Sequence, residues 1–577
     1  MSASQQRRTG LARQSVGLLA VVLVCCGAMA ARLVWLQLVQ GAHFKALADE
    51  NRIRLMPRNP MRGRLLDRHG LVLATNRLTY RLYIQPQQVS EASWPSLRDR
   101  LSRVVGISAI ELDRRRREGA NPEGYRIALA GPLRSDQVLR FREQAETLRG
   151  AEVDMDVLRA YPHGALAAHV LGYTSGITEE EYRRLEPDGY RIRDRIGRSG
   201  VEQVFESTLR GEWGGQQVEV NAAGQVQRVL GDKPAEAGRD LRLTLDLALQ
   251  KAAEQALNGV RKGAIVAMDP QTGAIRAMAS RPTFNPNVFS DGPSTLQWAN
   301  LNRPEAPLLN RALRGFPPAS TFKIVTTIAA LESGIYQSTS KVLTTKSFCY
   351  AGLCYGDHGA HGQVGFPFAL AVSSNTFYYR VGLRLGPQQL FKAARRMGYG
   401  LPTGIELGDE ESAGLMGDPA WKLRALGEPW TPVDSITSAI GQGALQVTPL
   451  QMARLYAAVA NGGWLVTPHL VERPNTQRQW IGLKPATLQV LRQGLRMVVT
   501  EGTARLLNDP KLPAVAGKTG TAEDPPRPDH AWFGGYAPAG KPTLVIIAFG
   551  ENSGGYGGTV AAPMVKALMT TWFRTER

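Results

Sequence analysis

One serine and one lysine have a spacing that suits nucleophilic catalysis. In PPASTFKIVTTIAALESG, residues 317–334, two prolines precede Ser320, and apolar residues then recur at helical spacing. Proline is tolerated before or at the start of a helix, so we predict Ser320 at a helix start and Lys323 one turn later on the same face. A serine hydroxyl becomes a nucleophile when a nearby base takes its proton, and a desolvated lysine can be neutral and act as that base.

This S-x-x-K pattern alone is weak, because it recurs at Ser338 and Lys341 in the polar stretch QSTSK, which we interpret as surface. Two further patterns strengthen the first copy. Residues 373–375, Ser-Ser-Asn, are the only S-x-N in the chain and offer a second hydroxyl and an amide ahead of an expected helix. Residues 518–521, Lys-Thr-Gly-Thr, contain the only K-T-G, whose lysine and threonines can bind a carboxylate.

The composition excludes several classes of protein. A chain of 577 residues with 43% hydrophobic and 21% charged residues is long enough for several packed domains, so wholesale disorder is excluded. Four cysteines are too few for a disulfide scaffold, and the 60 glycines follow no G-X-Y period, which excludes collagen. The net charge of +19 fits nucleic acid, an anionic membrane or an anionic wall polymer as partner.

The N-terminus narrows that choice. Residues 16–39 form an apolar run interrupted by Arg32 and long enough to cross about 30 Å of hydrocarbon as a helix. Because Arg7, Arg8 and Arg13 precede the run, we predict a cytoplasmic tail over 1–14, a transmembrane helix over 15–39 in the inner (plasma) membrane, and export of the rest. A signal peptide cleaved near residues 28–30, Ala-Met-Ala, is the alternative. Export makes nucleic acid an unexpected partner.

Two exported domains are expected. The first, residues 40–237, is arginine-rich and irregular, with a predicted hairpin turn at 67–70. The second comprises residues 238–577, and near its start Asp246 is a predicted helix N-cap. We expect strands over 264–269, 274–280, 530–538 and 543–550, and helices over 320–333, 368–385, 450–461 and 485–500. Antiparallel strands from both ends of this region, with helices between them, predict an α+β fold of the α/β sandwich type.

The three motifs in this order resemble the signature of the penicillin-recognising serine enzymes. RGRLLDRHGLVLATN, IGQGALQVTPLQMARLYAAVANGG and KTGTAEDPPRPDHAWFGGYAP are similar to class B penicillin-binding proteins. VEVNAAGQVQRVL, DHAWF and GENSGGYGG are most similar to the penicillin-binding protein 2 group of the elongation machinery, with division-specific relatives as the near alternative. The resemblance implies an elongated pedestal (dimerisation) domain over 40–237 and a serine β-lactamase-like transpeptidase domain over 238–577.

The resemblance also assigns roles. Ser320 would be the acylated nucleophile, Lys323 its general base, and Ser373 and Asn375 would assist proton transfer and substrate binding. The terminal carboxylate of the donor stem peptide, or of a β-lactam, would be bound at Lys518, Thr519, Gly520 and Thr521, with the backbone N–H groups of Ser320 and Thr521 as oxyanion hole. The implied reaction is D,D-transpeptidation: D-alanine leaves a D-Ala-D-Ala terminus, and an amine of a neighbouring strand resolves the acyl-enzyme. No cofactor is required for it.

Residues 347–364 crowd together cysteine, histidine and aspartate, which are zinc ligands. The candidate ligands are Cys349, Cys354, Asp357 and His361, with His358 beside them. Some members of the penicillin-binding protein 2 group carry a structural zinc here, with a cysteine just ahead of the S-x-N/D motif, but this chain has ALAVSSN there and no cysteine. A Cys349–Cys354 disulfide is the equal alternative in an oxidising compartment.

Competing functions are a β-lactamase or D,D-carboxypeptidase of the same chemistry, and a non-enzymatic scaffold or β-lactam sensor. An E-x-x-L-N match typical of class A β-lactamases, Glu254 to Asn258, lies ahead of Ser320, and we interpret it as chance. The residues before Leu241 contain no E-D-x-x-F-type glycosyltransferase motif. Glycan polymerisation would therefore be left to a partner, by resemblance a SEDS-family glycosyltransferase of RodA type, alongside other elongation-complex proteins.

Overall fold

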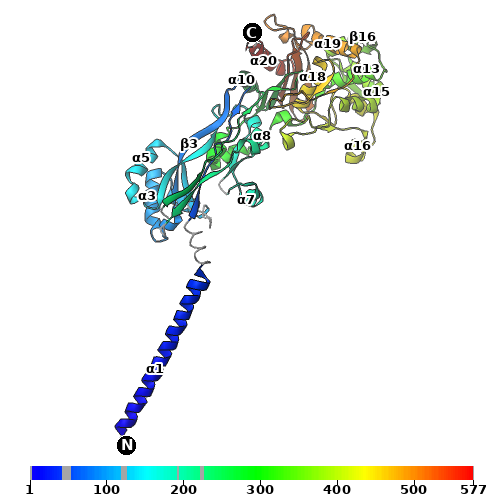
Figure 1. Cartoon of the computed structure of the whole chain (residues 1–577). Helices are drawn as coiled ribbons and strands as arrows, with labels where there is room; N and C mark the ends of the chain where they lie inside the picture. The colour runs from blue at the N-terminus through cyan, green and yellow to red at the C-terminus, as the bar shows by residue number, and fades with distance from the viewer. Residues whose placement is uncertain (1–2, 42–52, 119–126, 192–193, 221–225, 576–577) are drawn as a thin grey trace. The chain divides into compact units, whose positions relative to one another are not determined.

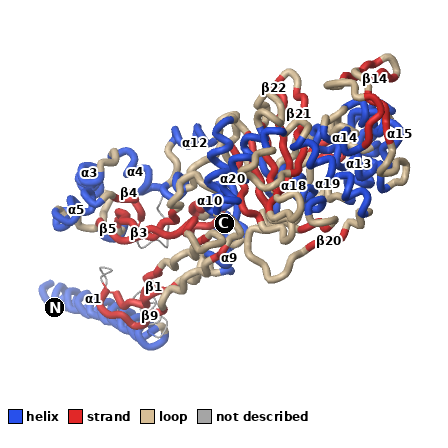
Figure 2. Tube along the Cα trace, turned by 90° about the horizontal axis from the view of Figure 1, so that it is seen from above, coloured by secondary structure: helices blue, strands red, loops and turns tan. Residues whose placement is uncertain are grey.

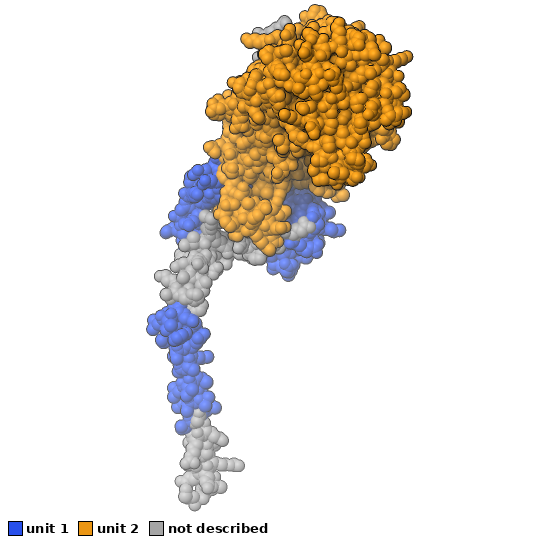
Figure 3. Space-filling view, turned by 90° about the vertical axis from the view of Figure 1, so that its right-hand side faces the viewer, with its two compact units in different colours: residues 1–61, 79–156, 212–237 blue, residues 62–78, 157–211, 238–577 orange. Residues whose placement is uncertain are grey.

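The computed structural model describes residues 3–41, 53–118, 127–191, 194–220 and 226–575, and they form two compact units. The first comprises residues 1–61, 79–156 and 212–237, and the second comprises 62–78, 157–211 and 238–577 (Figure 3). The predicted boundary near Ala237 coincides with the last residue of the first unit. The two segments 62–78 and 157–211, however, belong with the C-terminal unit, so the division is not contiguous in sequence.

The N-terminal helix is long and apolar. Helix α1 (Ala3–Val34) continues into a π-helical turn, η1 (Trp35–Val39), and Figure 1 draws α1 as one straight rod in blue. Residues Leu18–Val39 have a mean hydropathy of 2.2 and are long enough to cross a bilayer. This span lies inside the transmembrane helix predicted over 15–39.

The first unit contains two small sheets. Strands β1 (Ile53–Arg58), β8 (Gly214–Val220) and β9 (Val226–Lys233) are antiparallel in the order β1-β8-β9. The end of β3 (Val72–Ile84) pairs with β4 (Ile127–Leu133), and helices α3 (Trp94–Val105), α4 (Ala109–Glu118) and α5 (Ser135–Glu143) share one apolar core with them. In α3 the buried residues recur three and four positions apart, so one face of the helix supplies its share of that core.

The second unit opens on the predicted hairpin. Strand β2 (Leu65–Leu66) pairs antiparallel with the start of β3, with Leu65 opposite Ala74. The turn is closed by the Asp67 carboxylate, which accepts the backbone N–H groups of His69 and Leu71, both at 2.8 Å. Asp246 caps helix α10 (Leu247–Ala256) by accepting the N–H groups of Ala248 and Leu249 at 3.0 Å. Both predictions from turn and cap chemistry are confirmed.

A buried ion-pair network ties the segments 62–78 and 157–211 together. Glu202 is fully buried; it lies 2.6 Å from Arg62 through Oε2 and 2.6 Å from Arg159 through Oε1. Arg62 also reaches Glu206 at 2.6 Å. Arg159 lies near the end of β5 (Ala151–Ala160), Glu202 in α8 (Gly200–Val204) and Glu206 in α9 (Glu206–Leu209). The segment 157–211 also contains α6 (Ala168–Leu171), β6 (Thr174–Gly176), α7 (Glu179–Leu185) and β7 (Arg195–Gly197).

The centre of the second unit is a five-stranded antiparallel sheet. Its order is β12 (Ile275–Arg281), β11 (Gly263–Met268), β23 (Leu544–Gly550), β22 (Arg527–Ala537) and β21 (Ala516–Asp524). The four strands predicted from sequence are present, and β21 adds an edge. Strands from the two ends of the unit therefore meet in one sheet, which confirms the sandwich architecture.

Both faces of this sheet are apolar and covered by helices (Figure 2). In β11, Ile265 and Ala267 join a core with α10 and α20 (Ala561–Thr575), whereas Ala264 and Val266 join the larger core on the other side. That larger core includes α13 (Lys323–Glu332), α14 (Phe366–Ala371), α15 (Asn375–Arg396) and α18 (Pro449–Ala460), and α19 (Pro485–Thr500) contributes to both. The period-two alternation of a strand explains why its buried residues divide between two cores.

The single helix predicted over 368–385 is wrong, because the chain forms two helices there. The stretch 368–385 is not continuous, because residues 372–374 break it into α14 and α15. Ser373 has φ 57, in the left-handed region, and Ser374 caps α15 by accepting the N–H of Phe377 at 3.3 Å. Helix propensity cannot reveal this break, since tertiary contacts maintain it.

Replacing Glu202 with glutamine tests the buried network. Glu202→Gln removes the carboxylate that neutralises two buried arginines. We therefore expect a loss of about 3–5 kcal/mol in the free energy of unfolding of the second unit. The free energy of unfolding is measured by urea titration of the full chain in detergent, with tryptophan fluorescence as the readout. The matched control is Glu179→Gln, whose partner Arg183 is exposed, with an expected change below about 0.5 kcal/mol. Equal losses in the two variants would contradict this account.

Candidate active site

Ser320 lies in a tight turn that opens helix α13. The turn, η7 (Ala319–Phe322), is 3-10 helical, and α13 continues directly from Lys323. Ala319 has φ 51, a left-handed conformation that costs a non-glycine residue roughly 1–2 kcal/mol. The Ala319 N–H donates to the Gly441 carbonyl at 2.9 Å, which fixes this strained residue. The helix start predicted at Ser320 is confirmed, and Ser320 itself is half-buried.

Lys323 is fully buried and is held by oxygen atoms of the S-x-N turn. Its Nζ donates to the Ser373 carbonyl and to Asn375 Oδ1, both at 2.7 Å, and lies 3.3 Å from Ser373 Oγ. Burial disfavours the charged form and lowers the pKa of Lys323 to about 7, while the negative charge of Asp357 acts in the opposite direction. A lysine in this position can exchange a proton near neutral pH.

The K-T-G segment forms the edge strand β21 of the central sheet. Lys518 is fully buried, and its Nζ donates to the Thr519 carbonyl at 3.0 Å. Burial, together with the charge of Lys323, keeps the pKa of Lys518 well below its usual value.

The edge strand packs directly against the serine turn. A Cβ on Gly520 would lie 3.1 Å from the Thr321 methyl and 3.3 Å from the Pro318 carbonyl, so only glycine allows this approach without displacement. The Trp532 indole on β22 donates to the Pro317 carbonyl at 3.0 Å. Three segments far apart in the sequence thus converge: hydrogen bonds join S-x-x-K to S-x-N, and close packing joins S-x-x-K to K-T-G.

The two cysteines of residues 347–364 form a disulfide. Cys349 on β14 (Ser347–Tyr350) and Cys354 on β15 (Leu353–Gly356) lie opposite each other in an antiparallel hairpin and are bonded through their sulfurs. Their sulfur atoms are therefore not available as thiolates, the form that binds zinc.

The other candidate zinc ligands have other partners. Asp357 Oδ2 accepts the Ser374 hydroxyl at 2.6 Å and the Thr376 N–H at 2.8 Å, and the His361 ring contacts Phe368 edge-on at 5.5 Å. Among the described residues no group of three or more His, Cys, Asp or Glu side chains is placed to hold a metal. The zinc alternative for Cys349, Cys354, Asp357 and His361 does not fit this structure, whereas the disulfide alternative does.

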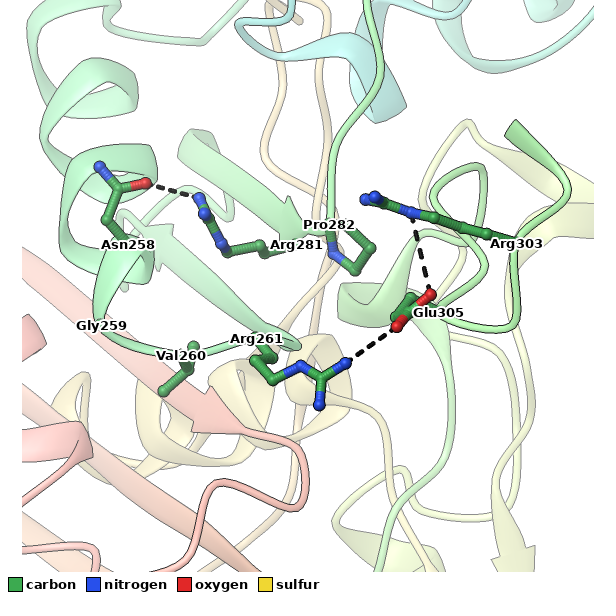
Figure 4. A pocket seen from close by; sticks show the side chains of 8 residues that line it. All are labelled: Asn258, Gly259, Val260, Arg261, Arg281, Pro282, Arg303 and Glu305. Carbon is green, nitrogen blue, oxygen red and sulfur yellow. Dashed lines mark hydrogen bonds and ion pairs between the residues drawn. The ribbon is translucent and has the colours of Figure 1, made fainter. Parts of the chain in front are cut away.

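The E-x-x-L-N match also has structural partners. The Glu254 carboxylate accepts a hydrogen bond from the Ala167 N–H at 2.6 Å. Asn258 Oδ1 accepts one from the Arg281 guanidinium at 2.5 Å, in the pocket drawn in Figure 4. That pocket is lined by Asn258, Gly259, Val260, Arg261, Arg281, Pro282, Arg303 and Glu305, which include no residue of the three motifs. These contacts agree with our interpretation of the match as chance.

Comparisons with known proteins agree with this geometry. Residues 263–570 match the penicillin binding protein transpeptidase domain, and residues 57–243 match the penicillin-binding protein dimerisation domain. The chain is 33% identical to peptidoglycan D,D-transpeptidase MrdA of Acinetobacter baumannii, over 96% of this chain and 87% of the relative. It is 32% identical to MrdA of Escherichia coli K12, over 95% of this chain and 91% of the relative. The chain belongs to the penicillin-binding protein 2 (MrdA) family.

Solved structures show the same relationship. A complex of penicillin-binding protein 2 and MreC from Helicobacter pylori matches with a TM-score of 0.83 and 26% identity, over 91% of this chain and 99% of that one. A peptidoglycan synthase complex matches with a TM-score of 0.73 and 31% identity, over 97% and 98%. As a member of the penicillin-binding protein 2 family, the chain is a serine peptidoglycan D,D-transpeptidase of cell-wall elongation, with the two-domain fold that the resemblance implied.

Several residues of the site could not be identified individually from the sequence. Gly441 was part of a stretch quoted for its resemblance, but its contact with the serine turn has no local signal. Thr503 Oγ1 lies 2.6 Å from Thr519 Oγ1, and the loop after α19 carries no pattern that indicates this contact. Asp357 did stand out, but as a zinc ligand rather than as an acceptor for the S-x-N turn.

Substituting Gly441 tests the support of the serine turn. A Cβ there would lie 2.2 Å from the Ala319 carbonyl, so Gly441→Ala must displace the turn that carries Ser320. Misplacement by about 1 Å can cost about a hundredfold in rate, and we expect penicillin acylation of the folded protein to slow at least tenfold. The rate of labelling by a fluorescent penicillin measures this.

Gly443→Ala is the matched control. Gly443 has φ 78, close to φ 75 of Gly441, but its Cβ would meet nothing nearer than Thr437 Oγ1 at 3.5 Å. The two variants share the backbone strain and differ in the clash, so only Gly441→Ala should lose acylation. Similar rates in both would show that the serine turn does not depend on this contact.

Proposed function

We propose that Ser320 is the acylated nucleophile of the transpeptidase and Lys323 its general base. One observation carries this proposal: Lys323, three residues after Ser320, has its Nζ buried among oxygen atoms of the S-x-N turn. A neutral lysine accepts the Ser320 proton as Oγ attacks the carbonyl carbon of the D-Ala-D-Ala bond. The proton taken by Lys323 would then pass through the hydroxyl of Ser373, whose Oγ lies 3.3 Å from Lys323 Nζ, to the departing amine of D-alanine, which leaves Lys323 neutral again.

The acyl-enzyme is then resolved by an amine of a neighbouring stem peptide. That amine attacks the acyl carbon, its excess proton passes to Lys323, and the ester bond to Ser320 breaks. A cross-link forms, and the serine hydroxyl is restored. Proton transfers of this kind through a positioned group contribute typically about 10²–10⁴-fold to rate.

Substrate binding is proposed for the edge strand and the S-x-N amide. Strand β21 ends the sheet, so its free edge can align an extended peptide by backbone hydrogen bonds. Lys518, Thr519 and Thr521 would bind the terminal carboxylate of the donor or of a β-lactam, with Gly520 allowing the close approach to the serine turn. Asn375 would bind the stem-peptide amide, and the N–H groups of Ser320 and Thr521 would stabilise the oxyanion.

Residues Leu18–Val39 are proposed as a single-pass anchor in the inner membrane, with the chain that follows Val39 on the outer side. A partner of MreC type and a glycan-polymerising partner are proposed from the related complexes. From the resemblance, we propose that the polymerising partner is a SEDS-family glycosyltransferase of RodA type. Net charge +19 supports contact with anionic lipid and wall polymer.

Mapping the penicillin adduct tests the nucleophile. Intact-mass analysis of the full chain should show one penicilloyl adduct, and peptide mapping should place it on Ser320. Ser320→Ala should form no adduct while keeping the melting temperature of the parent. An adduct on another residue, or an undiminished adduct in this variant, would overturn the assignment.

The pH dependence of acylation tests the base. Only neutral Lys323 accepts a proton, so below its pKa of about 7 the acylation rate should fall about tenfold per pH unit, and above that pKa it should level off. Stopped-flow labelling from pH 5 to 9 measures the profile. A rate that is flat across this range would contradict a lysine base.

The lifetime of the adduct separates a synthase from a hydrolase. A transpeptidase lacks a positioned water for the penicilloyl ester, and we expect the adduct to last for hours. Release within milliseconds would instead identify a β-lactamase. Loss of adduct with time, followed by mass after removal of free penicillin, gives the answer.

A further inference from the structure

Asp357 connects the disulfide hairpin to the S-x-N turn. One carboxylate oxygen, Oδ2, accepts the Ser374 hydroxyl at 2.6 Å and the Thr376 N–H at 2.8 Å, and the Thr376 hydroxyl lies 2.8 Å away. These donors belong to the N-cap and first turn of α15. A carboxylate at a helix N-terminus is also favoured by the helix dipole.

The hairpin that presents Asp357 is held in two ways. The Cys349–Cys354 disulfide closes β14 and β15, and the Asp357 N–H donates to the Lys346 carbonyl at 3.0 Å, just beyond the last paired residues. Phe348 packs in a buried cluster with Tyr379 of α15. Asp357 therefore follows directly from a segment that is both cross-linked and packed onto α15.

The S-x-N turn needs such support. Ser373 adopts φ 57, a left-handed conformation that persists only where the surroundings over-determine it. The same turn supplies the acceptors of Lys323 Nζ, which are the Ser373 carbonyl, Ser373 Oγ and Asn375 Oδ1. Any movement of the turn moves the lysine.

We propose that Asp357 is a positioning residue of the transpeptidase: the disulfide hairpin, residues 347–356, holds it so that it fixes the S-x-N turn around Lys323 without a metal ion. This inference rests on the proposed role of Lys323 as base. It also gives a reason why the zinc alternative does not fit. The serine of ALAVSSN nearest Asn375, Ser374, donates directly to Asp357, and the disulfide closes the hairpin.

A carboxylate, a second amine and a phenol ring influence Lys323. Asp357 raises the pKa of Lys323 against the effect of burial, Lys518 presents a second amine from β21, and the Tyr378 ring of α15 lies 5.5 Å from Nζ. Burial also keeps Tyr378 neutral by raising its pKa above the usual value. Removing the Asp357 charge therefore lowers the pKa of Lys323 further, since this carboxylate opposes the effect of burial.

The test compares Asp357→Asn with Asp409→Asn in the full chain in detergent. Asp409 is an exposed acid in a 3-10 turn and controls for the loss of one negative charge. We expect Asp357→Asn to lower the acylation rate constant at pH 8 at least tenfold and to move the midpoint of the pH profile below that of the parent. A merely structural defect would lower the labelled fraction and leave the midpoint of the remaining active molecules unmoved.

The disulfide is tested in the unaltered protein. Dithiothreitol transfers two electrons and two protons to the Cys349–Cys354 pair, which gives two thiols and oxidised dithiothreitol. Acylation should slow several-fold after reduction and recover after reoxidation, while the double variant Cys349→Ser, Cys354→Ser should be slow throughout and insensitive to the reductant. This arm does not depend on whether Asp357→Asn folds.

The outcomes separate this inference from the proposed function. If the adduct stays on Ser320 but Asp357→Asn and the reduced protein react within twofold of the parent, the positioning role is wrong and the serine mechanism stands. If the adduct maps elsewhere, the proposed function itself fails. A chelator that slows acylation, reversed by added zinc, would also overturn the metal-free account; unchanged rates after chelation support it.

Discussion

The placement of one buried amine is the constraint on which the catalytic unit depends. A lysine buried without partners would cost several kcal/mol as a cation, and hydrogen-bond acceptors reduce that cost. Here the Ser373 carbonyl, Ser373 Oγ and Asn375 Oδ1 surround Nζ of Lys323. These oxygens fix its position, while burial sets its pKa to about 7. The S-x-N turn therefore sets the position of the amine, and burial sets its proton affinity.

The architecture brings that turn to the nucleophile. Contacts between α13 and the start of α15 bring Lys323 next to Ser373. Strand β21 comes much later in the chain, and its Lys518 follows Lys323 by nearly two hundred residues. Because β21 is the last strand of the sheet, one of its edges is not used by the sheet, and the serine turn packs against the strand at Gly520. The sheet can therefore be covered by helices on both faces and still offer a strand to a peptide at its edge.

Local patterns predicted much of this. Proline followed by helical periodicity located Ser320, and turn chemistry located the hairpin at Asp67. Short apolar stretches, two of them joined by a turn, located β11, β12, β22 and β23. Prediction failed where tertiary contacts decide. The break at Ser373 and the capture of Asp357 by Ser374 and Thr376 depend on segments distant in sequence. Cysteine and aspartate in a short span likewise fit zinc or a disulfide equally until their partners are known.

Two non-glycine residues beside the chemistry, Ala319 and Ser373, are in the left-handed region, and each of these conformations costs roughly 1–3 kcal/mol. Neither is maintained by its own motif. Ala319 depends on Gly441, whose missing Cβ leaves space for the Ala319 carbonyl, and the turn at Ser373 is bounded by Asp357. The motifs supply the reacting groups, but their geometry comes from residues that no motif contains. A chain could therefore keep all three motifs and lose activity through either support, so intact motifs alone are weak evidence of a working transpeptidase.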